Sequence, residues 1–127
     1  ALFTALTFVL FPALTFGQAG TGTGLKGDYF SNTNLTGQVA ASRIDPQINF
    51  AWGAVAAAAG VPADKFSARW TGQVEAPVTG TFTFGTRSDD GIRLWVNNRL
   101  LIDNWTNHSP MWDQTIPVTL NAGQRYN

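Results

Sequence analysis

Two adjacent aspartates, Asp89 and Asp90, stand before Gly91 and between two stretches rich in apolar residues. Carboxylate oxygens are hard ligands that suit Ca²⁺, which takes about six to eight oxygens from side chains, carbonyl groups and water. An Asp-Asp-Gly sequence also forms ordinary solvated turns, because these residues tolerate tight backbone conformations. The pair is therefore a candidate metal site, and a plain turn is the alternative.

A second polar segment follows about fifteen residues later and contains Asp103, Asn104, Trp105, Asn107 and His108. An aromatic face can stack on a sugar ring, and side-chain amides can hydrogen-bond to its hydroxyl groups. We therefore interpret Asn104, Trp105 and Asn107 as candidate ligand-binding residues beside the aspartate pair. The alternative, which we favour for the segment as a whole, is a turn that places Trp105 in the core.

Catalysis by these residues is not expected. A glycosidase needs two carboxyl groups about 5–9.5 Å apart across a cleft, and adjacent aspartates are poorly placed for that. The single histidine, His108, has no nucleophile-elbow motif near it. We predict that the chain is not an enzyme, although a parent protein could carry a separate catalytic domain such as a glycoside hydrolase.

Composition narrows the remaining functions. The 127 residues carry 8 basic and 8 acidic side chains, so no charge excess points to nucleic acid. The absence of cysteine excludes disulfide scaffolds and thiolate zinc sites. A zero net charge fits a neutral ligand such as a sugar better than a polyanion.

The N-terminal stretch has the pattern of an export signal. No ionisable side chain occurs before Lys26, and residues 1–16 are mostly apolar but too few to span a membrane comfortably. Small residues at Gly17 and Ala19 suit signal peptidase. We predict a signal peptide over residues 1–19 that lacks its basic start, then a flexible lead-in over residues 20–24. A buried helix or strand pair is the alternative.

Residues 25–127 alternate with the period of half-buried strands. Ile92, Leu94 and Val96 would share one face of a strand, and Arg93 and Trp95 the other. The same pattern recurs in Ile48–Trp52, Phe66–Trp70, Phe82–Phe84 and Ile116–Leu120. These short strands predict an all-β fold, an antiparallel β-sandwich or barrel.

Two further segments of the predicted domain carry an expectation. The segment Ala54–Ala59 is expected to be a loop or a single helical turn, because glycines bracket it. The last five residues look like the start of another strand, so we expect the domain to lack its last strands. We therefore expect further domains in the parent protein.

Several motifs occur in order at close spacing: Trp70–Gly72, Pro77–Phe84, Ser88–Val96 and Leu101–Trp105. Together they resemble the protective-antigen-type domain, the "PA fourteen" family, which is shared by a toxin component, flocculin adhesins and many secreted glycosidases. The first strand and a late turn of that family are similar to Gly27–Phe30 and Leu120–Tyr126. The resemblance covers nearly all of residues 25–127.

The resemblance implies a β-sandwich whose sugar-binding members hold Ca²⁺ with two adjacent aspartates joined by a cis peptide bond. Asp89 and Asp90 occupy the matching positions, whereas the family's other calcium loop has no counterpart in this chain. The implied function is a non-catalytic, calcium-dependent carbohydrate-binding module of a secreted or cell-surface protein, without membrane insertion of the mature domain. The alternative is a structural or protein-contacting β-domain accessory to a larger secreted enzyme.

Overall fold

The computed structural model describes residues 6–12 and 22–127, and within these ranges the chain forms strands and loops without a helix. The strands are β1 Leu6–Pro12, β2 Leu25–Phe30, β3 Ala41–Asp45, β4 Asn49–Phe50, β5 Ser67–Thr71, β6 Val74–Glu75, β7 Gly80–Ser88, β8 Ile92–Val96, β9 Arg99–Asn104, β10 Met111–Gln114, β11 Val118–Leu120 and β12 Arg125–Tyr126. The predicted all-β class is confirmed. Nothing in these ranges qualifies as an apolar helix of membrane-spanning length.

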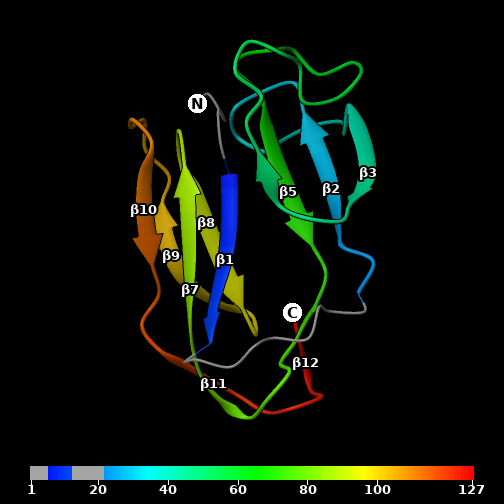
Figure 1. Ribbon diagram of the computed structural model, residues 1–127. Coiled ribbons are helices and arrows are strands. Elements are labelled where there is room, and N and C mark those ends of the chain that lie inside the picture. The colour runs from blue at the N-terminus through cyan, green and yellow to red at the C-terminus, as the bar shows by residue number, and fades with distance from the viewer. Residues whose placement is uncertain (1–5, 13–21) are drawn as a thin grey trace.

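Strand β7 lies at the centre of the largest sheet, whose order is β10–β7–β1–β4 (Figure 1). One edge of β7 pairs with β10 near Ser88 and with β11 near Gly80. The other edge pairs with β1, from Thr7 opposite Arg87 to Pro12 opposite Phe82. All these pairings are antiparallel, so a nine-residue strand organises most of this layer.

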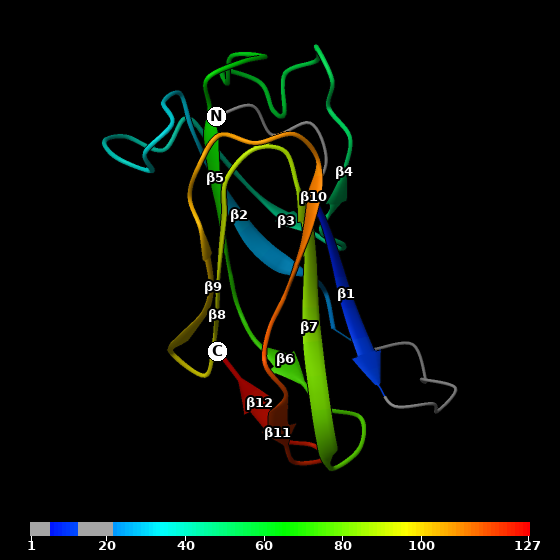
Figure 2. The same cartoon turned by 90° about the vertical axis from the view of Figure 1, so that its left-hand side faces the viewer.

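Three smaller sheets complete the architecture: β3–β2–β5, the β8–β9 hairpin and the short β6–β12 pair. The β8–β9 hairpin faces the β7 sheet from the opposite side of the molecule (Figure 2). Phe82 and Phe84 of β7 pack with Leu94 of β8 and Ile102 of β9 in one buried cluster. The two layers therefore enclose a core in the manner of a β-sandwich.

A second buried cluster lies under the β3–β2–β5 sheet and the long loop before β5. Tyr29, Phe66 and Ala68 form its centre. Trp70 packs against both clusters, and its ring lies 5.9 Å from that of Phe50 in a stacked arrangement. Trp70 therefore connects the two cores.

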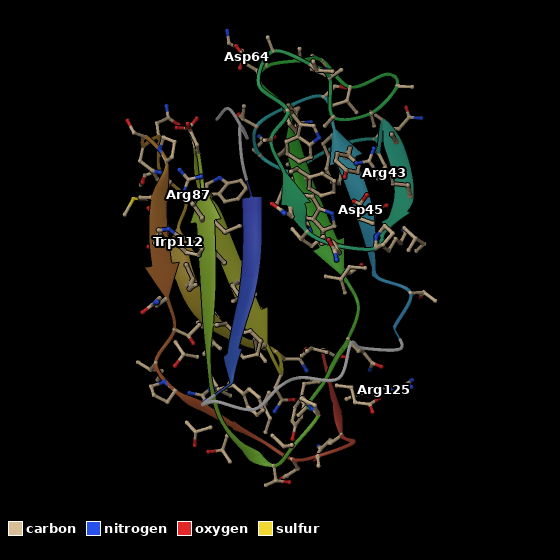
Figure 3. The ribbon with its side chains drawn as sticks, viewed as in Figure 1. Arg43, Asp45, Asp64, Arg87, Trp112 and Arg125 are labelled. Carbon is tan, nitrogen blue, oxygen red and sulfur yellow. The ribbon has the colours of Figure 1, made fainter. Side chains whose placement is uncertain are left out.

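Asp45, at the end of β3, is the most buried carboxylate among the described residues, with 3% of its surface exposed. It accepts hydrogen bonds from Arg43 Nε at 2.6 Å and from Trp70 Nε1 at 2.7 Å. Arg43 also donates to the carbonyl oxygen of Ala57 at 2.8 Å. Figure 3 shows Arg43 and Asp45 side by side at the β2–β3 sheet.

The predicted alternation holds on β8, where Ile92, Leu94 and Val96 are buried and Trp95 is half exposed. It fails before β11, because Ile116 is 68% exposed. Pro117 has no N–H to donate to a ladder, so the strand begins only after it. The loop expected at Ala54–Ala59 is confirmed.

Part of the predicted export signal is a strand in this structure. Leu6–Pro12 forms β1, whereas residues 1–5 and 13–19 lie outside the described residues. Strand pairing does not report on cleavage by a peptidase. The signal peptide over residues 1–19 and the lead-in over residues 20–24 therefore stay predictions.

Candidate functional site

The aspartate pair lies in the loop that joins β7 to β8. This loop and the one that joins β9 to β10 sit at the same end of the molecule (Figure 2). Asp89 and Asp90 are both half-buried, and the peptide bond between them is cis, as the family resemblance implies. The β7–β8 sequence thus places two neighbouring carboxylates at a loop that a second loop covers.

Gly91 lets the two loops approach each other. A Cβ atom at this position would lie 3.0 Å from the backbone nitrogen of Thr106, 3.0 Å from Trp105 Cα and 3.1 Å from the carbonyl oxygen of Asn104. These are backbone atoms, which cannot swing away as a side-chain end can. Glycine at this position therefore permits the contact between the aspartate loop and residues 104–106.

His108 connects the β9–β10 loop to the aspartate pair through a hydrogen bond. Its backbone N–H donates to Oδ1 of Asp90 at 2.8 Å. Its ring Nδ1 lies 2.9 Å from the carbonyl oxygen of Ser109, which can only accept, so Nδ1 carries the proton. Within the described residues, the buried Nε2 atom has no hydrogen-bond partner.

The candidate residues Asn104 and Asn107 differ in their surroundings. The side-chain amide of Asn104 donates to Asp113 Oδ2 at 3.0 Å and its oxygen accepts from Thr106 at 2.8 Å. Asn107 is exposed and borders a hollow of about 110 Å³ that Gly91 and Trp105 also line. The fold thus brings Asn107 and Trp105 to the aspartate loop, whereas Asn104 is engaged in holding β9 to β10.

Trp105 is half-buried and packs against the second core cluster. The guanidinium of Arg93 lies over its ring, 5.3 Å from the ring centroid. This position agrees with the favoured alternative, in which the tryptophan belongs to the core. Its face towards Arg93 is occupied by that cation.

The arginines that flank the aspartate pair in sequence have other neighbours in space. Arg93 forms an ion pair with Asp103, with 2.6 Å between Nε and Oδ1. Arg87 lies opposite Trp112 in the β7–β10 register, and Figure 3 shows the two side chains next to each other. Arg93 therefore balances a carboxylate on β9.

The carboxylate oxygens of the aspartate pair are ligands of the kind that a hard cation prefers. Two carboxylates come from Asp89 and Asp90, and loop carbonyl groups and water are the usual remaining ligands of Ca²⁺. Within the described residues, no cluster of three or more His, Cys, Asp or Glu side chains is arranged to hold a metal. The pair can thus supply part of a calcium coordination shell, and no third acidic side chain joins it within the part of the chain that the structure describes.

An antiparallel β-sandwich with an aspartate pair in the loop between two of its strands defines the class of domain. The model of the family described as "PA14 domain" matches residues 22–127. The chain belongs to the PA14 domain family, as the sequence motifs indicated.

Several proteins similar to this chain are named as anti-sigma factors. The chain is 42% identical over 107 residues to "Anti-sigma-I factor RsgI3" of Acetivibrio thermocellus, a match that covers 84% of this chain and 16% of that protein. A solved "anti-sigma factor domain-containing protein" is 40% identical with a TM-score of 0.78, over 83% of this chain and 36% of the other. Another, from Clostridium clariflavum, is 36% identical with a TM-score of 0.78, over 91% and 41%.

These relatives correct the predicted function. We expected a carbohydrate-binding module with a carbohydrate partner, similar in function to adhesins, lectins and glycosidase modules. This expectation was wrong, because the relatives are named as anti-sigma factors. The alternative of a structural or protein-contacting β-domain agrees better with them. Sequence reasoning failed here because one fold and one loop motif serve several functions.

Proposed function

We propose that this chain is a regulatory domain of an anti-sigma-factor-type protein and acts through contacts with protein. The observation that carries the proposal is the 42% identity to an anti-sigma factor over 84% of the chain. Two solved anti-sigma-factor proteins support it with TM-scores of 0.78. The chain spans only 16% of the curated relative's length, so the repressing activity of the whole protein belongs to this proposal as well.

The outer face of the β8–β9 hairpin supports a role in protein contact. Trp95 is 51% exposed and lies opposite Leu100, which is 45% exposed, in the hairpin register. The Arg93–Asp103 ion pair lies next to them in the same hairpin. Aromatic and arginine side chains are enriched in protein interfaces, and a charged rim around an apolar centre is their usual arrangement.

We place the domain outside the cytoplasm. The stretch without ionisable side chains before Lys26 supports export of the residues that follow it. A domain on the far side of a membrane would then regulate transcription from a distance, which requires a longer protein than this sequence of 127 residues.

A chimera tests the regulatory proposal. The matching 107 residues of the Acetivibrio thermocellus anti-sigma-I factor are replaced by residues 20–127 of this chain, and transcription from a sigma-I-dependent reporter is measured over growth on different media. We expect the chimera to repress and release the reporter as the parent does. A chimera with an unrelated all-β domain of similar size is the control. Constant reporter activity in the first chimera would contradict the proposal.

We also propose that Asp89 and Asp90 bind Ca²⁺ and that the ion joins the β7–β8 loop to the β9–β10 loop. Bound Ca²⁺ would neutralise two neighbouring carboxylates, one of which already accepts the His108 N–H at 2.8 Å. A ligand that binds only the folded state raises stability by about 2.7 kcal/mol at 100 times its dissociation constant. The ion would therefore fix the geometry of this end of the domain.

Calorimetric titration of CaCl₂ into the EDTA-treated full chain tests the calcium proposal, with thermal unfolding as a second readout. We expect saturable binding and a raised unfolding temperature in the parent, and neither in the Asp89→Asn/Asp90→Asn double variant. Asp64→Asn removes an exposed carboxylate from another loop and is expected to bind as the parent does. Absence of binding by the parent, or equal binding by the double variant, would contradict the proposal.

A further inference from the structure

The long edge of β7 that faces β4 has one strand partner within the described part of the chain. Residues 82–87 of β7 pair with β1 in antiparallel register, from Phe82 opposite Pro12 to Arg87 opposite Thr7. The opposite edge of β7 is covered separately by β10 and β11. Among the described residues, β1 is thus the sole strand partner along this edge of residues 82–87.

Strand β4 joins the same sheet through β1 alone, among the residues that the structure describes. Its pairs are Leu6 opposite Phe50 and Thr7 opposite Asn49. Phe50 in turn stacks on Trp52, with 4.7 Å between ring centroids. Strand β1 therefore lies between β7 and β4 in the order of the sheet, and both ribbon views show it beside β7 (Figures 1 and 2).

Loss of β1 would leave the backbone N–H and C=O groups along one edge of β7 without strand partners, which is energetically unfavourable. Phe82 and Phe84 anchor β7 in the core, at 1% and 5% exposure, so the strand cannot move out to seek another partner. Its freed N–H and C=O groups would then form a template for another strand, because an open edge of a long strand readily accepts one. The position of β1 between β7 and β4 has the direction and length for an antiparallel segment of about six residues.

We propose that the space between β7 and β4 is a strand-acceptor site and that its occupant is the segment Leu6–Pro12. The segment is held by backbone pairing, so it needs no covalent connection to the rest of the domain to occupy the site. Pro12 stands at the last pair of the ladder, where a missing N–H is tolerated. The inference is independent of the regulatory proposal.

The occupant lies within the predicted export signal, and this gives the site a consequence. Cleavage near Ala19 would convert β1 from a tethered strand into a separate peptide. The N-terminal segment then has a second role besides export: it closes the sheet while it is attached, and the site opens when it leaves. An opened site would accept a peptide of the same sequence in trans.

A nicked full chain tests this inference. A recognition sequence for a specific protease is inserted between Gly17 and Gln18, and the folded chain is cut. A labelled peptide with the sequence of residues 4–14 is then added in excess, and a Val9→Pro version is the matched control, because proline removes a donor in mid-ladder. Hydrogen exchange is followed in residues 82–87, with residues 26–30 of β2 as an internal reference.

We expect the labelled peptide to replace the cut fragment, and the Val9→Pro peptide to fail to do so. Removal of the fragment without a replacement is expected to speed exchange in residues 82–87 by about tenfold or more, with little change in residues 26–30. Unchanged protection of residues 82–87 after the fragment has left would overturn the proposal. Equal entry of both peptides, or entry of neither into the emptied site, would also overturn it.

Discussion

The hydroxyl group of Tyr29 donates a hydrogen bond to Oδ2 of Asp45 at 2.6 Å, and both side chains are buried. The bond connects β2 to the end of β3. The same hydroxyl oxygen accepts a bond from Arg43 at 2.8 Å, and the Arg43 guanidinium lies 4.7 Å from the Tyr29 ring centroid. Burial, and then the Asp45 carboxylate, raise the pKa of Tyr29 well above its ordinary value, so the hydroxyl stays a donor.

Replacement of Tyr29 by Phe tests how much the hydrogen bond from Tyr29 to Asp45 contributes to the free energy of unfolding. The change removes one donor to a buried carboxylate and keeps the ring, so we expect the free energy of unfolding to fall by about 2 kcal/mol. The measurement is urea-induced unfolding of the full chain at neutral pH. Tyr126→Phe is the control: its hydroxyl only accepts a bond from the Asn121 backbone N–H, so a loss of about 1 kcal/mol is expected. A larger loss in the control would contradict the assigned role of Asp45.

Stability should fall in acid because of Asp45. Burial raises the pKa of Asp45, but hydrogen bonds from Tyr29, Trp70 and Arg43 together lower it more, and the pKa lies below its ordinary 3.8. A carboxyl group whose pKa is lowered on folding contributes stability above its unfolded pKa, and this is lost as the pH falls through its folded pKa. We expect the free energy of unfolding to decline from about pH 5 downwards.

Asp45→Asn separates this group from the other acids. The variant should be less stable than the parent at pH 7 and should lose less stability between pH 5 and pH 3. Some decline should remain, because hydrogen bonds from Ser42 and then Lys26 lower the pKa of Asp28 as well. Asp64→Asn, at an exposed loop position seen in Figure 3, serves as the charge-matched control. The same acid dependence in Asp45→Asn and in the parent would refute the assignment.

Gly27 lies against the same group of side chains. A Cβ atom there would stand 2.5 Å from Asp45 Oδ2 and 2.9 Å from Trp70 Nε1, the two atoms that bond to each other. We expect Gly27→Ala to lower the free energy of unfolding by about 1–3 kcal/mol, because the neighbours must move apart. Gly80→Ala, with nothing within 4 Å of the new Cβ, should change it by less than about 1 kcal/mol. Equal effects in urea unfolding would show that the contact at Gly27 is relieved at no cost.

The sequence was sufficient for the fold class and for the position of the aspartate pair, because both depend on local signals. Alternation on β8 and the turn residues around it are readable within about ten residues. The hydrogen bond from His108 to Asp90 spans 18 residues and depends on the β9–β10 loop folding back, which no local pattern encodes. The same holds for Asp45, whose partners Tyr29 and Trp70 are 16 and 25 residues away.

The function of the domain could not be predicted from local sequence patterns in the same way as its fold. The aspartate pair and the motifs around it identified the family, and the family match over residues 22–127 confirmed it. The partner could not be read from the same residues, because they build the loop whatever the domain contacts. Comparison with the anti-sigma factors was needed to correct it.

The turn between β8 and β9 depends on two residues with left-handed backbone conformation. Asn97 and Asn98 form the two-residue loop of this hairpin, with φ angles of 52° and 61°. Two residues with positive φ match the twist of a hairpin, and glycine suits the second position best. We therefore expect Asn98→Gly to keep or slightly raise the free energy of unfolding. Asn98→Val should lower it by about 1–2 kcal/mol, because a β-branched residue is strained in the left-handed region.

Urea unfolding of both Asn98 variants and of Asn107→Val tests whether the left-handed backbone conformation causes the expected loss of stability. Asn107 is exposed as well, and its φ is not among the positive values of the described residues, so valine there should lower the free energy of unfolding only slightly. A loss in Asn98→Val that exceeds both other variants assigns the cost to backbone conformation. If Asn98→Gly and Asn98→Val lose the same stability, the asparagine side chain rather than its backbone angle is responsible, and the turn assignment is wrong.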